Sequence, residues 1–301
     1  MGLDGGIIRA RRGALGEKSS NLFEVIAGKS ILAFHRDDPE DAPPTTKCFA
    51  LVQNYDKKPK RRLFDLLESQ GMQANQQITF FSDGGDNVRK IPEYLNPESE
   101  HILDWFHITM RITVLQQYAR GLQKTKTQDK KNEKPKDKSA EKPEERTLER
   151  RLESVKHYLW HGNSAEALET LRDLIEDLAC WDRNEEGEPI SRSDSPAAKM
   201  LKCAYEMETY IINNAGYIVN YGERYRNGER ISTGFVESTI NQVVSKRMVK
   251  KQQMQWTPKG AHLLLQVRTQ VLNDDWEDAF RDWYPGFRPE QTPVLEMAMA
   301  A

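Results

Sequence analysis

The stretch ITFFSDGGDNVRKIP covers residues 78–92. It begins with the apolar run ITFF, continues with the polar SDGG, and ends with the amphipathic DNVRKIP. Its first part is rich in β-branched and aromatic residues, which favours a short buried strand. Gly84 and Gly85 then indicate a turn, and Asp86 is a suitable N-cap for the helix that follows. We therefore expect a strand, a tight turn and a helix, with Asp83 directly after the strand.

Apolar segments on both sides extend this pattern. Three strands are expected before it, at residues 3–11, 21–34 and 46–55. Residues 60–72 predict a helix that has leucines on one face and is closed by Gly71, and residues 101–106 predict a further short strand. The order of three strands, helix, strand, helix and strand is that of a ribonuclease-H-like fold. We expect an α/β protein with a mixed sheet flanked by helices.

The composition changes after residue 123. Residues 124–150 are rich in Lys and Glu and nearly devoid of apolar side chains, which predicts a disordered or extended loop. Residues 151–228 have apolar side chains at intervals of three and four, which predicts an all-helical insertion. The α/β domain is then expected to begin with residues 1–123 and to resume with residues 229–301.

The composition also excludes several classes of protein. The chain has no run of about eighteen apolar residues and no apolar leader, so neither a membrane span nor a secretory signal is expected. Its three cysteines, Cys48, Cys180 and Cys203, are far apart, which favours buried free thiols over a zinc site or disulfides. We expect a cytoplasmic protein.

The net charge of −2 conceals local basic clusters. Residues 246–251, KRMVKK, carry four positive charges and no acid, and residues 11–18, RRGALGEK, are also locally basic. Such clusters suit contacts with DNA phosphates, and a solvated cationic face is the plainer alternative. The side chains concerned are Arg11, Arg12, Lys246, Arg247, Lys250 and Lys251.

Three acidic residues lie within or next to the expected ordered elements. Asp4 opens the first strand, Asp83 follows the strand of residues 78–82, and Glu237 lies in the apolar helical context GFVESTINQVV. Taken singly, a DGG sequence is more often a turn, and a Glu near a helix start is ordinarily favoured by the helix dipole. If the three carboxylates converge, their oxygens suit a pair of magnesium ions.

Four ordered blocks of the chain carry a family resemblance through these same residues. The blocks are LDGGIIRARRG with FEVIAGKSI, then ITFFSDGGDNVRKIP, then HILDWFHITMRI, and finally TGFVESTINQVVSKRMVKKQQMQWTPKGAHLLLQVRTQVL. Together they resemble the Kra-type insertion-sequence transposases, which are relatives of the Mutator-like DDE transposases. The resemblance implies metal-dependent cleavage and transfer of DNA strands during transposition of a bacterial insertion sequence.

The resemblance also implies roles for individual residues. Asp4, Asp83 and Glu237 would be the catalytic triad that holds two Mg²⁺ ions, for which Mn²⁺ is expected to substitute. Asp104 and His107, in DWFH, would support the site or contact DNA, and a capped helix start is the equally weighted alternative. On the expected helix after residue 234, the face of Glu237 would also carry Asn241, Ser245 and Met248.

The implied partners are the DNA of the transposon ends and of the target. A homo-oligomer on DNA is expected because two ends must be joined, and the protein would associate with the nucleoid. Members of this group ordinarily have a DNA-recognition region before the first Asp, whereas only three residues precede Asp4. We therefore expect an N-terminally truncated member. The alternatives are a DNA-binding derivative that no longer cuts, and a purely structural helical module.

Overall fold

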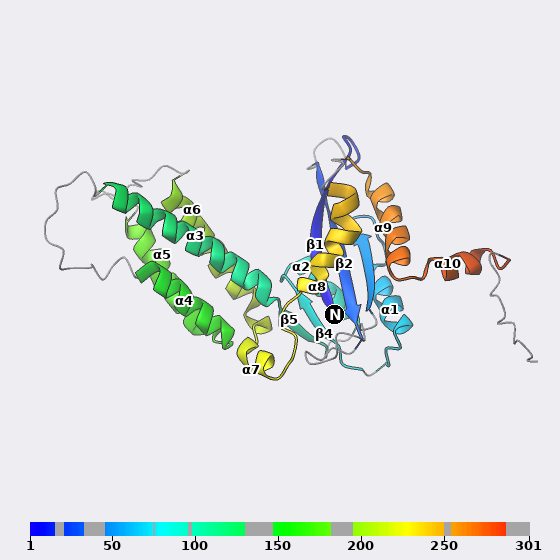
Figure 1. The fold of residues 1–301 in the computed structure, drawn as a ribbon, viewed down its shortest axis with the longest axis horizontal. Helices are drawn as coiled ribbons and strands as arrows, with labels where there is room; N and C mark the ends of the chain where they lie inside the picture. Colours follow the sequence, from blue (N-terminus) through cyan, green and yellow to red (C-terminus); the bar gives the residue numbers. More distant parts are fainter. Residues whose placement is uncertain are drawn as a thin grey trace, which may run out of the picture. The chain divides into compact units, whose positions relative to one another are not determined.

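The computed structural model of this chain describes residues 1–15, 21–32, 46–74, 76–95, 98–129, 147–181, 195–249 and 254–286. Two compact units are present. The first contains Met1–Leu3 and most of the chain from residue 76 to Phe235, and the second contains Asp4–Leu32, residues 46–74 and the part from Val236 onward. Figure 1 shows the helices and strands of each unit.

Five strands form one mixed sheet in the order β3-β2-β1-β4-β5. The strands β2 and β3 are antiparallel, whereas β1 is parallel to β4 and β4 is parallel to β5. The prediction of a mixed sheet flanked by helices is confirmed, and so is the expected order of its elements. The strands are β1 (Gly2–Arg9), β2 (Leu22–Ile31), β3 (Thr46–Val52), β4 (Thr79–Ser82) and β5 (Glu100–Leu103).

Two short helices lie between these strands. The first, α1 (Pro59–Ser69), buries Leu63, Leu66 and Leu67, which are the leucines of its predicted apolar face. It ends just before Gly71, whose φ of +85° is a conformation that glycine adopts without strain. The second, α2 (Asp86–Leu95), has Asp86 as its first residue and not as the predicted N-cap, and this acid suits the positive end of the helix dipole.

The remaining helices of the second unit follow residue 234. They are α8 (Gly234–Ile240), the π-helix η3 (Asn241–Val249), α9 (Pro258–Leu272) and α10 (Trp276–Trp283). Thr257 caps α9 by accepting a hydrogen bond from the Gly260 N–H at 3.1 Å. Pro258 occupies the first turn of α9, where its missing N–H costs nothing.

Side chains of α9 bond the backbone of β3, which is the first strand in the sheet order. Gln266 donates to the Ala50 carbonyl at 2.8 Å, and the imidazole Nδ1 of His262 accepts from the Val52 N–H at 3.4 Å. At the end of the helix, the Asn273 amide accepts from the Cys48 N–H at 2.7 Å and donates to the Cys48 carbonyl at 2.8 Å. Polar backbone groups at the edge of the sheet thereby gain partners.

The first unit is mostly helical, and this confirms the expectation of helices after residue 106. Its apolar core joins β4 and β5 to α3, α4, α5, α6 and α7. The helix α3 continues through Lys124–Asp129, which the sequence predicted as part of the charged loop; residues 130–146 lie outside the described part of the chain. The helices are α3 (Trp105–Asp129), α4 (Thr147–Trp160), α5 (Ser164–Trp181), α6 (Pro196–Asn214), the short η2 (Ala215–Tyr217) and α7 (Tyr221–Arg226).

The three cysteines are free, but they are not all buried. Cys48 is buried in β3, and desolvation raises the pKa of its thiol to about 11. Cys203 is half-buried and Cys180 is exposed, so the prediction of buried thiols was wrong for Cys180. Cys180 lies in the last turn of α5, on the side of that helix away from its apolar stripe.

Replacing Asn273 with Ala tests the link between α9 and β3. We expect a loss of about 1 to 3 kcal/mol in the free energy of unfolding, because both polar groups of Cys48 lose their partner. Urea denaturation followed by circular dichroism measures it. The control is Lys259→Ala, an exposed position on the same helix. Equal stabilities of the two variants would show that the Asn273 hydrogen bonds contribute nothing.

Candidate active site

Asp83 lies in a tight turn between β4 and α2. Gly84 has a φ of +87°, and its N–H donates to the Ser82 hydroxyl at 3.2 Å. The Gly85 N–H donates to Oδ1 of Asp83 at 3.0 Å, so the turn also orients the carboxylate. The Ser82 hydroxyl is itself 2.8 Å from the His101 Nε2 atom on β5. Each polar group of the turn therefore has a defined direction.

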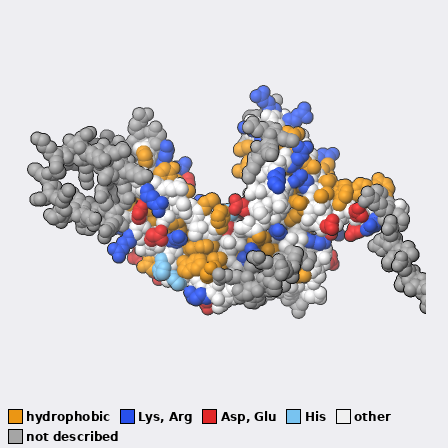
Figure 2. Space-filling model, viewed as in Figure 1, with side chains coloured by type: hydrophobic (Ala, Val, Ile, Leu, Met, Phe, Trp, Pro, Cys, Tyr) orange, Lys and Arg blue, Asp and Glu red, His pale blue; other side chains and the backbone are white. Residues whose placement is uncertain are grey.

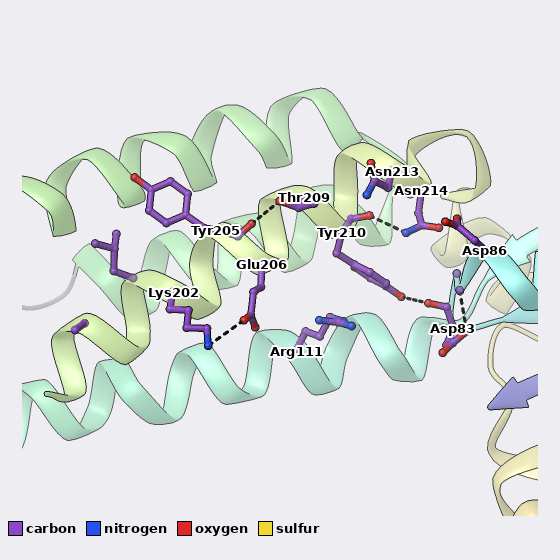
Figure 3. Close-up of a pocket in the computed structure, with 14 residues that line it drawn as sticks. Asp83, Asp86, Arg111, Lys202, Tyr205, Glu206, Thr209, Tyr210, Asn213 and Asn214 are labelled. Carbon is purple, nitrogen blue, oxygen red and sulfur yellow. Dashed lines mark hydrogen bonds and ion pairs between the residues drawn. The ribbon is translucent and has the colours of Figure 1, made fainter. Parts of the chain in front are cut away.

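A groove with a volume of about 990 Å³ opens beside Asp83 within the first unit (Figure 3). Its walls are the turn after β4, one residue of α3 and one face of α6. Both signs of charge are present, since Arg111 and Lys202 line it together with the carboxylates of Asp83 and Glu206. The Lys202 Nζ atom lies 3.9 Å from the Glu206 carboxylate, one turn further along α6. The groove is a polar surface with an acid at one end.

Asp104 lies between β5 and α3 and is fully buried. Its Oδ1 atom accepts from the Phe106 N–H at 2.9 Å and from the Thr233 N–H at 3.0 Å. Its Oδ2 atom accepts from the Thr233 hydroxyl and lies 2.8 Å from the His107 Nδ1 atom. A buried carboxylate is tolerated only when such donors surround it.

These contacts fit the capped-helix interpretation of Asp104. It caps the start of α3 and has no exposed surface. His107 has 20% of its side chain exposed and holds the carboxylate from the helix side. Thr233 was not identified from the sequence, because nothing in its neighbourhood indicates a partner that lies 129 residues earlier.

Asp4 and Glu237 both belong to the second unit. Asp4 lies within β1, and its Oδ1 atom accepts from the Gly5 N–H at 2.7 Å. Asp4 and Gly6 share one face of the strand because side chains alternate along it. A Cβ atom added to Gly6 would lie 3.9 Å from side-chain carbons of both Ile240 and Val244. The helical segment that starts with α8 therefore packs on the strand face that carries Asp4.

Glu237 is an exposed residue in the first turn of α8, three residues before Ile240. Residues three apart on a helix lie on neighbouring positions of one surface. Glu237 therefore borders the side of α8 that faces β1, while Val236 and Thr239 are buried beneath it. Asn241, the expected supporting residue, is half-buried one turn further on.

The α-helical geometry predicted for residues 234–251 is replaced by a π-helix from Asn241 to Val249. Arg268 on α9 donates to the Val243 carbonyl at 2.8 Å and also to the Gln242 carbonyl. Met248 is buried, so it does not share the exposed surface of Glu237 as the α-helical spacing predicted. Long π-helices are rare, and π-helical turns often occur at functional sites.

The predicted DNA-binding cations of the second unit are mostly exposed. Arg11, Arg12 and Lys246 are exposed and Arg247 is half-buried; Lys250 and Lys251 lie outside the described residues. Lys and Arg side chains gather at the top of this unit, over the turn after β1 (Figure 2). Segment 254–256 runs beside the end of β1, because the Trp256 N–H donates to the Arg9 carbonyl at 3.0 Å.

Among the residues that the structure describes, no three His, Cys, Asp or Glu side chains form a group that could hold a metal ion. The expected convergence of Asp4, Asp83 and Glu237 is therefore not visible as a ready-made cluster. The donor types still suit a hard cation, because all three are carboxylates. Likewise, no helix in the described ranges is long and apolar enough to cross a membrane.

Comparison of the chain with models of known protein families, with curated proteins and with solved structures found no match.

Replacing Asp104 with Ala tests its structural role. We expect a loss of about 3 to 5 kcal/mol in the free energy of unfolding, because buried donors from Phe106, His107 and Thr233 lose their acceptor. Thermal and urea denaturation measure the change, with the exposed Asp86→Ala as the control. A variant as stable as the control would mean that the buried network does not hold this part of the fold.

Proposed function

We propose that this chain is the catalytic part of a DDE transposase with a ribonuclease-H-like fold, which cuts and joins DNA strands during transposition of an insertion sequence. Asp4, Asp83 and Glu237 would hold two Mg²⁺ ions, with Mn²⁺ able to replace them. The DNA of the transposon ends and the target would be its partner. A homo-oligomer on that DNA follows from the need to bring two ends together.

The observation that carries the proposal is the register of the two parallel strands β1 and β4. Gly2 pairs with Phe81, and β1 and β4 are neighbours in the sheet. Asp4 and Asp83 each follow these paired residues by two positions. This equal spacing from a parallel pair supports the proposal that both carboxylates serve one ion.

The packing of α8 in the second unit supports the role of the third acid. Contacts of Ile240 and Val244 at Gly6 direct the helix that carries Glu237 to the strand face that carries Asp4. Gly6 leaves this face of the strand without a side chain, so the helix can approach closely. Glu237 therefore belongs to a helical segment that packs on the first strand, although residues 4 and 237 are far apart in sequence.

Carboxylate oxygens fit Mg²⁺ better than zinc, because Mg²⁺ prefers hard oxygen ligands and keeps several waters. When bound, such ions activate a water or a 3′-hydroxyl and stabilise the oxygen that leaves phosphorus. The chain's part is to orient the acids: amides of Gly5 and Gly85 hold one oxygen of Asp4 and Asp83 respectively. Three carboxylates repel one another without a cation, so their close approach depends on it.

The cations near the end of β1 and in η3 supply a place for DNA phosphates. Arg11, Arg12 and Lys246 are exposed, and each neutralised phosphate releases counterions. The near-neutral total charge does not oppose this role, because binding depends on local clusters.

A DNA-binding derivative that does not cut is the second candidate. It is favoured by one observation, namely that the described residues contain no ready-made metal group. Both candidates predict DNA binding, and only the first predicts cleavage that depends on Mg²⁺ or Mn²⁺.

Nicking by the wild-type protein decides between them, and Asp83→Asn tests the role of Asp83. The wild-type protein is expected to nick supercoiled DNA with Mg²⁺ or Mn²⁺, and the variant is expected to be slower by about 100-fold or more, because a metal ligand is removed. Gel electrophoresis of the plasmid measures the rate. The matched control is Asp86→Asn, three residues further on in the first turn of α2, which should cut at the wild-type rate. Wild-type nicking by Asp83→Asn would remove Asp83 from the mechanism.

A triple variant, Arg11→Ala with Arg12→Ala and Lys246→Ala, tests the DNA surface. The slope of log affinity against log salt concentration should become shallower by about 0.9 for each phosphate that the variant no longer neutralises. Fluorescence anisotropy with duplex DNA measures the slope at several salt concentrations. Lys259→Ala on α9 serves as the control. An unchanged slope in the triple variant would assign DNA binding to another surface.

A further inference from the structure

The turn that carries Asp83 is held by a helix from much later in the chain. The Tyr210 hydroxyl on α6 donates to the backbone carbonyl of Asp83 at 2.9 Å, across a separation of 127 residues. The helix α6 belongs to the helical insertion, and the same first unit contains the turn. Figure 3 shows the tyrosine ring reaching from α6 toward Asp83.

Asn214, one helical turn further along α6, lies against the same turn. Its side-chain nitrogen donates to the Tyr210 carbonyl at 2.9 Å, and only 3% of the residue is exposed. Its oxygen has no hydrogen-bond partner among the described residues and lies against Gly84. A Cβ atom at Gly84 would come within 2.4 Å of that oxygen, so the close approach depends on glycine.

Arg111 on α3 fixes the tyrosine ring from the opposite side. Its guanidinium carbon lies 4.2 Å from the centre of the Tyr210 ring, which is a cation–π contact. The Tyr210 ring is thus held by Arg111 while its hydroxyl donates to the Asp83 carbonyl.

We propose that Tyr210, assisted by Asn214 and Arg111, is a positioning residue that sets where the Asp83 carboxylate points. The inference rests on the proposed function, because it concerns the acid that would bind metal. The physical link is short: Tyr210 holds the Asp83 carbonyl, while the Gly85 N–H holds the Asp83 carboxylate at 3.0 Å. The peptide group after Asp83 carries both the carbonyl that Tyr210 holds and the Gly84 N–H that bonds Ser82, so its rotation would break these two bonds and move the adjoining Gly85 N–H away from the carboxylate.

The positioning role of Tyr210 links Asp83 to helices that are remote from it in sequence. The helical insertion shapes the candidate site because its helix α6 bonds the turn directly. Arg111 of α3, which precedes the insertion, packs on the tyrosine that makes this bond. Loss of a single hydroxyl should therefore alter the turn and the metal affinity while the helices remain packed.

Tyr210→Phe removes only that hydroxyl, and Tyr205→Phe is its matched control, since Tyr205 is an exposed tyrosine on the same helix. Hydrogen exchange with NMR detection should show amides of Gly84 and Gly85 exchanging about fivefold faster in Tyr210→Phe, as expected when one hydrogen bond is removed. Mn²⁺ affinity measured by electron paramagnetic resonance should fall by about 3- to 10-fold. The melting temperature should fall by no more than about 4 °C.

The glycine exchange rates and the Mn²⁺ affinity distinguish a failure of the positioning role from a failure of the proposed function. Unchanged glycine exchange in Tyr210→Phe would overturn the positioning role, whatever the enzyme does. Faster exchange with unchanged Mn²⁺ affinity would also overturn it, because the turn would then not control the carboxylate. If the wild-type protein binds no Mn²⁺ and cuts no DNA, the proposed function fails, and the positioning role built on it fails with it. A lower kcat for nicking with an unchanged KM for DNA supports the role.

Discussion

The first unit depends on the satisfaction of one buried carboxylate. Asp104 is completely removed from solvent, and an ionised carboxylate in that position is tolerated only while donors surround it. The donors come from the first turn of α3 and from Thr233. The chain must therefore return to Asp104 after the helices that follow it. Asp104 and Thr233 are 129 positions apart, yet their hydrogen bonds bring the chain back to β5. The next helix, α8, starts directly after Thr233.

The turn after β4 is also held by contacts with residues remote in sequence. This turn is a narrow structure in which Gly84 lies against a buried amide and Asp83 is held through its main chain. The segments that precede and follow the helices of the first unit both bond Asp104, and α6 bonds the turn at Asp83. The helical insertion therefore helps to hold the turn that carries Asp83. If Asp83 binds metal as proposed, the insertion contributes to the site.

Elements with strong periodicity could be predicted from the sequence. The strands have β-branched and aromatic runs, and the leucine face of α1 and the apolar stripes of α4 to α6 repeat at helical spacing, so local pattern and final burial agree. Residues whose partners are remote could not be found this way. Thr233 and Tyr210 have roles set by atoms more than one hundred positions away, and the π-helix at residue 241 has ordinary helix-forming residues whose carbonyls are bonded by Arg268 of α9. Cys180 was misjudged because cysteine is buried on average and this one faces outward.

The covering of β3 by α9 bears on how copies of this chain can meet. An uncovered edge strand recruits strands from other molecules and leads to ribbon-like aggregates. Here the backbone groups of Cys48, Ala50 and Val52 are already engaged by His262, Gln266 and Asn273, so this strand cannot extend the sheet into a neighbour. Any assembly that uses this side of the second unit must therefore form through side chains of α9 and not through a continuous intermolecular sheet.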